Sequence, residues 1–181
     1  MFVYLLRHGQ DTLDKRGGWS REPLTSMGIE QVKETSNKLK GIQFDKVLSS
    51  DLIRTVETTK ILKDILNLKD IVYYQELREV NNGILAGMDN EIAEKRFPGL
   101  YWNTLKWDEN YPNGESPKAF YERVKVFWER IKKETPEDST ILIVAHQGVF
   151  EVIQNLENGT DYTNKKQSYT VKTGEFVVLD I

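Results

Sequence analysis

Cysteine is absent from this sequence, and histidine is nearly so, with 2 among 181 residues. Without cysteine there can be no disulfide bond, no zinc site built on thiolates and no cysteine nucleophile. The two histidines, His8 and His146, are then the first places to look for chemistry.

Long apolar runs and a large excess of charge of one sign are also missing. No stretch approaches the roughly 20 apolar residues that a membrane span needs. The first apolar run, residues 2–6, ends in an arginine, whereas a signal peptide is longer and carries its charge before the apolar region. The formal net charge is −3, with lysine and arginine scattered among carboxylates, which argues against a general nucleic-acid binder. We expect a cytoplasmic protein with no nucleic-acid and no membrane partner.

What is present is the composition of an ordinary globular protein, long enough to bury a substantial core, so we expect residues 1–181 to form a single domain. Apolar runs typical of buried strands alternate with segments whose apolar residues recur at helical spacing. The expected strands cover residues 3–6, 45–49, 71–77, 140–145 and 176–179, and the expected helices cover about 26–40, 53–65, 117–131 and 149–156.

This alternation predicts the α/β class, as a three-layer α/β/α sandwich around a mostly parallel central sheet. Ser50 and Ser116 are suited to cap the helices that follow them, and Gly41 is suited to end the first helix.

Both histidines follow predicted strands. Arg54 would lie on the first helical turn after the second strand, and Glu79 would lie just after the third. Ligands of open α/β sheets bind outside the carboxyl ends of the strands. We therefore expect these four ionisable side chains to meet at one edge of the sheet.

Two histidines, two arginines and a glutamate, without a cluster of metal ligands, indicate phosphoryl chemistry. Arg7 and Arg54 could grip the oxygens of a phosphoryl group, because a guanidinium is a planar fork of donors that stays charged. A neutral imidazole can attack phosphorus, and the second imidazole could contact the same oxygens. A carboxylic acid could protonate the leaving oxygen and later accept a proton from water, and Glu79 is the candidate.

Several short motifs also occur in an order known from one protein family. They are Arg7-His8-Gly9; Gly18-Trp19; Pro23-Leu24-Thr25 with Gly28; Ser49 to Thr55; Leu77-Arg78-Glu79 with Gly83 and Gly87; Gly114-Glu115-Ser116; and Val144-Ala145-His146 with Gly148. On these motifs the chain resembles the histidine phosphatase superfamily, in the branch similar to phosphoglycerate mutase. One such motif alone is weak support, but the ordered set spans nearly the whole chain.

The resemblance implies a phosphoglycerate mutase-like fold and a phosphatase that acts on a small phosphorylated metabolite. His8 would be the nucleophile that becomes phosphohistidine, and Glu79 would be the proton donor. Arg7, Arg54 and His146 would form the phosphate pocket. No metal and no organic cofactor is implied.

The first motif departs from the family pattern. Asp11 stands where the family usually has threonine or serine, and Asp14 falls near a position that is often asparagine. An ionised Asp14 could not donate a hydrogen bond to phosphate and would repel it, so we leave it out of the site. Gln10 or Thr12 could supply the missing donor. The candidate substrate-binding residues are Arg7, His8, Gln10, Thr12, Arg54, His146 and Gln147.

Two other functions compete with a phosphatase. Mutases of this family carry an arginine directly after the acid, whereas here Val80 and then Asn81-Asn82 follow Glu79, and the segment 80–117 looks short for a mutase insertion. These features favour hydrolysis. The second competitor is a catalytically weak protein that binds a phosphorylated ligand, which Asp11 and Asp14 would favour.

The aromatic segment 97–111, with Trp102 and Trp107, has two interpretations. It could be a satellite cluster that packs under a long loop, or it could form a wall of the substrate pocket. The first interpretation is slightly favoured.

Overall fold

The computed structural model describes all of residues 1–181, and its centre is one five-stranded sheet. The strand order is β3-β2-β4-β1-β5, and β5 alone pairs antiparallel, against β1. The mostly parallel sheet is thereby confirmed. The strands are β1 (Phe2–Arg7), β2 (Lys46–Ser50), β3 (Ile71–Tyr74), β4 (Thr140–Ala145) and β5 (Phe176–Asp180).

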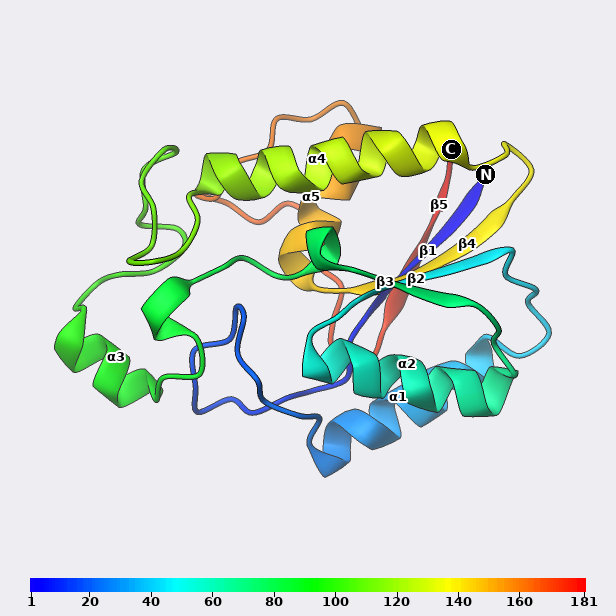
Figure 1. Cartoon of the computed structure of the whole chain (residues 1–181), viewed down its shortest axis with the longest axis horizontal. Helices are drawn as coiled ribbons and strands as arrows, with labels where there is room; N and C mark the ends of the chain where they lie inside the picture. The colour runs from blue at the N-terminus through cyan, green and yellow to red at the C-terminus, as the bar shows by residue number, and fades with distance from the viewer.

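Helices cover both faces of the sheet. In Figure 1, α4 and α5 lie on one side of the strands, and α1 and α2 lie on the other. The α/β class and the three layers are therefore confirmed. The helices are α1 (Ser26–Lys38), α2 (Ile53–Leu66), α3 (Asn90–Arg96), α4 (Pro117–Glu134) and α5 (Gln147–Glu157), with short 3-10 helices η1 (Gln75–Leu77) and η2 (Gly83–Leu85). None of the helices has the length and apolar character needed to cross a membrane.

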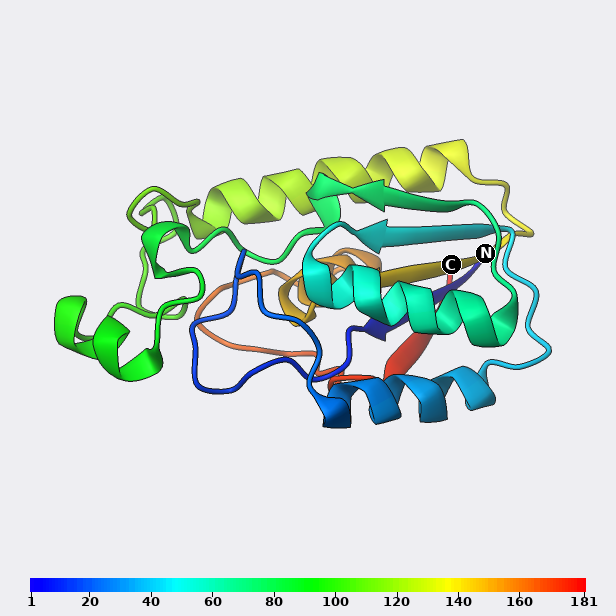
Figure 2. The same cartoon turned by 60° about the horizontal axis from the view of Figure 1, so that its bottom comes forward.

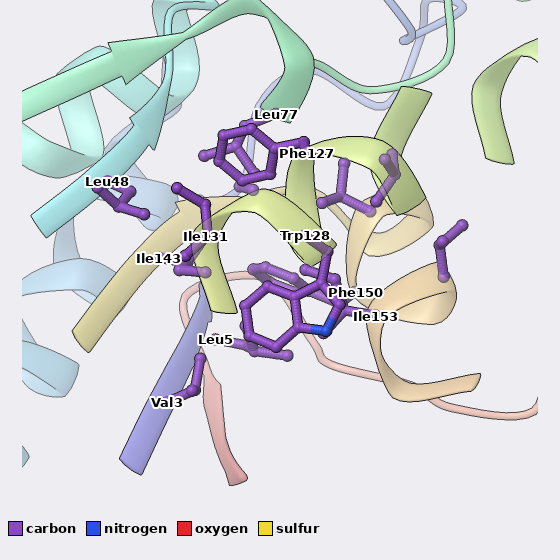
Figure 3. Close-up of a cluster of buried hydrophobic side chains, with 14 of the residues drawn as sticks. Val3, Leu5, Leu48, Leu77, Phe127, Trp128, Ile131, Ile143, Phe150 and Ile153 are labelled. Carbon is purple, nitrogen blue, oxygen red and sulfur yellow. The ribbon is translucent and has the colours of Figure 1, made fainter. Parts of the chain in front are cut away.

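Strands β1 and β4 are buried on both faces, which explains why their sequences show no polar alternation. Leu5 and Ile143 point into the larger core cluster, which α4 and α5 cover, and Leu6 and Val144 point into a second cluster under α1 and α2. Figure 3 shows the larger cluster, in which the Trp128 ring lies among aliphatic and aromatic side chains. The central strands are thus fixed from two sides, and so are the residues at their ends.

Two helices begin at side-chain caps. Thr25 Oγ1 accepts from the amide of Gly28 at 3.1 Å, and Ser116 Oγ accepts from the amide of Ala119 at 3.2 Å. The cap at Ser116 was predicted. The predicted cap at Ser50 is wrong, because Ser50 is the last residue of β2 and α2 begins after Leu52, without a side-chain cap.

The third strand is shorter than predicted. β3 ends at Tyr74, and η1 then turns the chain so that Leu77 is fully buried in the larger core cluster. The sequence of residues 71–77 is apolar enough for a strand, but residues 75–77 form a 3-10 turn that buries Leu77 in the core. Glu79 is thereby placed next to the edge of the sheet.

The segment between η1 and α4 contains a helix that the sequence did not indicate. α3 packs, through Ala93, into a small third cluster with Leu85, Leu105 and Tyr111. Figure 2 shows this segment extending beyond the sheet, on the side toward which the β2 and β3 arrows point. The segment therefore lies beside the carboxyl ends of the parallel strands.

Candidate active site

Three separate segments bring the two histidines and Arg54 together at the carboxyl edge of the sheet. His8 follows β1, His146 follows β4, and Arg54 lies in the first turn of α2. The two imidazole centroids are 5.0 Å apart. All three side chains are buried, with exposed fractions of 4% for His8, 0% for His146 and 2% for Arg54.

Arg54 is hydrogen-bonded to both histidines of this pocket. Its Nε donates to His8 Nε2 at 3.3 Å, and its Nη2 lies 3.2 Å from His146 Nδ1. The same guanidinium donates to the Gly18 carbonyl at 2.7 Å and to Ser20 Oγ at 3.2 Å. Arginine can only donate, so the two ring nitrogens that face it carry lone pairs.

His8 is arranged as a nucleophile. Its Nδ1 lies 2.7 Å from the Gly9 carbonyl, which can only accept, so the proton is on Nδ1 and the lone pair is on Nε2. Burial, followed by the positive charge of Arg54, lowers the pKa of His8 well below 6.5. The ring is therefore neutral at physiological pH, with Nε2 facing the guanidinium.

His146 has the opposite tautomer. Its Nδ1 accepts from Arg54, and its Nε2 lies 2.9 Å from Ser50 Oγ, so the proton is on Nε2 and points to the serine. Burial, followed by the charge of Arg54, also lowers the pKa of His146 well below 6.5. Ser50 was missed as a site residue because its helix-capping appearance hid this role. Its place at the end of β2 is the signal that could have revealed it.

The guanidinium of Arg7 is only partly hydrogen-bonded. Its Nη1 donates to the Val171 carbonyl at 2.9 Å, but its Nε is buried and has no hydrogen-bond partner. After burial and the charge of Arg54, the charge of Arg7 also acts on His8 and lowers the pKa of that ring. Two guanidinium groups at this sheet edge therefore supply positive charge beside His8.

Glu79 lies beside the pocket with its backbone held from two sides. Its carbonyl accepts from Trp19 Nε1 at 2.7 Å and from Arg123 Nη2 at 3.3 Å. Its carboxylate accepts from the amide of Gly148 at 3.3 Å. A Cβ at position 148 would come within 2.4 Å of Glu79 Oε1, so a larger residue there would displace the carboxylate.

The other candidate residues are placed differently. The Gln147 side chain donates to the Tyr169 carbonyl at 2.7 Å and accepts from the Val171 amide at 2.9 Å, so it holds the segment before β5. Gln10 makes hydrogen bonds only through its backbone, and Thr12 makes none with the pocket. None of the three is hydrogen-bonded to Arg7, His8, Arg54 or His146.

The two aspartates of the first loop also differ. Asp14 is exposed, and its backbone carbonyl accepts from the Asn90 amide at 2.9 Å. Asp11, in contrast, reaches the pocket, with Oδ2 at 3.6 Å from Arg54 Nε. The loop thus directs one carboxylate into the pocket and the other away from it.

A cavity of about 490 Å³ adjoins the pocket at Glu79 and Gly148. Aromatic side chains line it, among them Trp102, Phe120 and Tyr162, together with amides and the carboxylate Glu151. The lining does not include the two histidines, Arg7 or Arg54. The charged pocket and the cavity are therefore neighbours that share Glu79.

The aromatic segment is both a packed cluster and a cavity wall. Trp102 stacks on Tyr111 at 6.2 Å and meets Phe120 edge-on at 5.6 Å, and it also lines the cavity. Trp107 packs on Tyr121 and Tyr162 outside the lining. The two interpretations of this segment therefore hold together.

Comparisons with known proteins agree with this geometry. The chain is 32% identical over 156 residues to a 2,3-bisphosphoglycerate-dependent phosphoglycerate mutase from Parvibaculum lavamentivorans, covering 80% of this chain and 73% of that protein. Its fold is similar to the crystal structure of the alpha-ribazole phosphatase from Shigella flexneri, with a TM-score of 0.86 and 28% identity, covering 100% of this chain and 91% of that one. Residues 3–181 match the family model of the histidine phosphatase superfamily, branch 1, so the chain belongs to that superfamily.

Proposed function

We propose that this protein is a phosphatase that hydrolyses a small phosphorylated metabolite through a phosphohistidine at His8, without a metal ion. One observation carries the proposal. The unprotonated Nε2 of His8 faces Arg54 in a buried pocket, and Arg7 is near enough for its charge to act on His8 as well. A neutral nucleophile beside two guanidinium groups is what phosphoryl transfer requires.

In the first step, His8 Nε2 attacks phosphorus as the bond to the leaving oxygen breaks. Arg7 and Arg54 stabilise the charge on the equatorial oxygens. The Gly9 carbonyl, bonded to Nδ1–H, stabilises the positive charge that develops on the ring. Glu79, in its protonated form, gives its proton to the leaving oxygen, which departs as an alcohol.

In the second step, water attacks the phosphohistidine and Glu79 takes the proton from that water. The bond from phosphorus to Nε2 breaks, and inorganic phosphate and neutral His8 are restored. In this scheme, bound phosphate draws Arg54 toward its oxygens and away from His146 Nδ1. His146 then donates to the same oxygens from Nδ1, once its proton is on that nitrogen and its Nε2 accepts from the Ser50 hydroxyl.

The rest of the substrate would occupy the cavity that begins at Glu79. Its aromatic walls and side-chain amides suit a ring-bearing alcohol, and its volume suits a small metabolite. The solved relative from Shigella flexneri is named an alpha-ribazole phosphatase. Alpha-ribazole 5′-phosphate is therefore the first metabolite to test.

A phosphoglycerate mutase is the second candidate, favoured by the name of the relative from Parvibaculum lavamentivorans. A mutase must hold a second acidic group of its substrate. No arginine lines the cavity here, and of the two lysines that do, Lys165 and Lys166, the first already donates to the carbonyls of Asn103 and Leu105. The side-chain oxygens of Asn81 and Asn82 accept from the amides of Gly83 and Trp19. These features support hydrolysis over transfer. The cytoplasmic location stays a prediction.

The proposal is tested with p-nitrophenyl phosphate in the presence of EDTA. The native protein should release nitrophenol, and His8→Ala should not. A ³²P-labelled substrate quenched in the native reaction should leave an acid-labile, base-stable phosphoprotein. Asp14→Asn, an exposed change on the same loop, is the matched control. No release by the native protein would leave only a binder, and transfer between phosphoglycerates would identify a mutase.

A further inference from the structure

The unexpected feature of the pocket is the carboxylate of Asp11. Its Oδ2 lies 3.6 Å from Arg54 Nε, the same nitrogen that donates to His8 Nε2 at 3.3 Å. Only 18% of the Asp11 side chain is exposed. A phosphoryl group gripped by Arg54 next to His8 would therefore come close to this carboxylate.

The charged groups around Asp11 come from three segments. Arg54 on α2 and Arg7 at the end of β1 face it with positive charge, and Glu22, before α1, adds negative charge. Glu22 is itself paired with Lys15 at 2.8 Å. Burial raises the pKa of Asp11, while Arg54 and Arg7 act in the opposite direction.

The neighbouring imidazoles do not add charge. Both His8 and His146 have a lowered pKa and stay neutral. In the free protein, Asp11 forms the salt bridge to Arg54, and Glu79 is a second, more weakly acting negative charge. A bound phosphoryl dianion would compete with Asp11 for this guanidinium and would repel its carboxylate.

A single proton between the two anions removes that repulsion. A carboxylic acid donating to a phosphoryl oxygen forms a short, charge-assisted hydrogen bond. The new negative charge next to Asp11 also favours its protonated form. Protonated Asp11 is then a hydrogen-bond donor to the anion. Gln10 and Thr12, the other candidate donors of this loop, make no hydrogen bond to the site residues.

We propose that Asp11 makes phosphate binding proton-linked: the pocket takes up one proton with the anion and holds it between Asp11 and an anion oxygen. The inference rests on the proposed function, because it concerns the same pocket. When Asp11 is ionised in the free protein, binding combines its carboxylate, one proton from the solvent and one phosphoryl dianion. The product of this binding reaction is a carboxylic acid that is hydrogen-bonded to the dianion. Binding should therefore strengthen as the pH falls.

Sulfate is the probe, because it remains a dianion across the neutral range and any proton taken up then belongs to the protein. Titration calorimetry near pH 7, in two buffers of different ionisation enthalpy, measures that uptake. The native protein should take up close to one proton per sulfate, and Asp11→Asn should take up almost none. The variant should also bind sulfate roughly tenfold more tightly near pH 7, since a repulsive charge is removed.

Two further variants locate the proton. Asp14→Asn should behave as the native protein, and Glu79→Gln should keep the uptake even though its activity falls. Sulfate binding without proton uptake, or uptake that survives in Asp11→Asn, overturns the inference and leaves the proposed phosphatase intact. If neither sulfate nor phosphate binds to the native protein or to Asp11→Asn, the proposed function fails together with the inference.

Discussion

The phosphate pocket and the adjoining cavity are built in opposite ways. The pocket gathers buried side chains of Arg54, His8 and His146 at or near the ends of central strands, and hydrogen bonds fix each of them. The cavity is lined by aromatic, amide and lysine side chains, mostly from segments 101–103 and 162–167. The sheet edge thus supplies the chemistry, and the segments beyond it supply the surface for the rest of a substrate.

This contrast has a direct kinetic meaning. A change in the pocket should slow the reaction for every phosphorylated substrate, because all share the phosphoryl group. A change in the cavity should depend on the alcohol. Glu79, which belongs to both, should show an intermediate pattern.

The largest effect is expected for Arg54→Lys. Lysine cannot hold both imidazoles and the Gly18 carbonyl with one planar fork, so kcat should fall by about 10²- to 10³-fold. Steady-state kinetics with an aryl phosphate and an alkyl phosphate should show similar losses. A loss confined to one substrate would contradict the distinction between the pocket, which acts on every substrate, and the cavity, which depends on the alcohol. Lys33→Ala on the exposed surface of α1 is the control.

Glu79→Gln should separate substrates by their leaving groups. An alkyl alcohol needs a proton when it departs, so kcat for an alkyl phosphate should fall by roughly 10²-fold. Nitrophenolate departs without one, so the loss with p-nitrophenyl phosphate should be much smaller. Equal losses with both substrates would remove Glu79 from the role of proton donor.

Stability should depend on pH through the two histidines of the pocket. The pKa values of His8 and His146 are lowered in the folded protein, so the unfolded chain binds more protons once the pH falls below about 6.5. The free energy of unfolding should therefore decrease as the pH falls, by at most about 1.4 kcal/mol per histidine per pH unit. Asp11 has a raised pKa and acts in the opposite sense at lower pH, so the window is kept above about pH 5.

Urea unfolding at several pH values between about 7.5 and about 5.5 measures this slope. His146→Gln should reduce it, and Tyr162→Phe in the cavity wall should not. A flat stability profile in the native protein would mean that the imidazoles are not kept neutral by burial.

The smallest effect is expected for Trp102→Phe in the cavity wall. The smaller ring keeps an aromatic contact with Phe120 but leaves space beside the substrate, so KM for a ring-bearing substrate should rise by about threefold to tenfold. KM for a small alkyl phosphate without a ring should change little, and so should kcat for both substrates. An equal fall in kcat for every substrate would show that this wall also positions the pocket.

The sequence predicted the sheet and the convergence of the two histidines because both depend on local patterns. A continuous apolar run marks a strand buried on both faces, and the residue after it lies at the strand's end. His8 and His146 follow such runs. The same patterns misplaced Ser50, since a serine before a helix looks like a cap whether or not its hydroxyl is needed elsewhere.

The short helix α3 and the inward position of Asp11 had no local signal. α3 has one fully buried residue, Ala93, so it lacks the periodic apolar face that marks a helix in a sequence. Asp11 and Asp14 are chemically alike, and only the path of the loop decides which one reaches Arg54.

The sequence by itself determined the α/β class, the strands on which the site is built and the residue types available for phosphoryl chemistry. The tertiary structure decided the tautomers of the two imidazoles, the partnership of His146 with Ser50 and the placement of one carboxylate beside Arg54. The physical reason is how far apart along the chain the interacting residues lie. Strands and helices follow from neighbours along the chain, whereas protonation and charge pairing depend on groups brought together from distant segments.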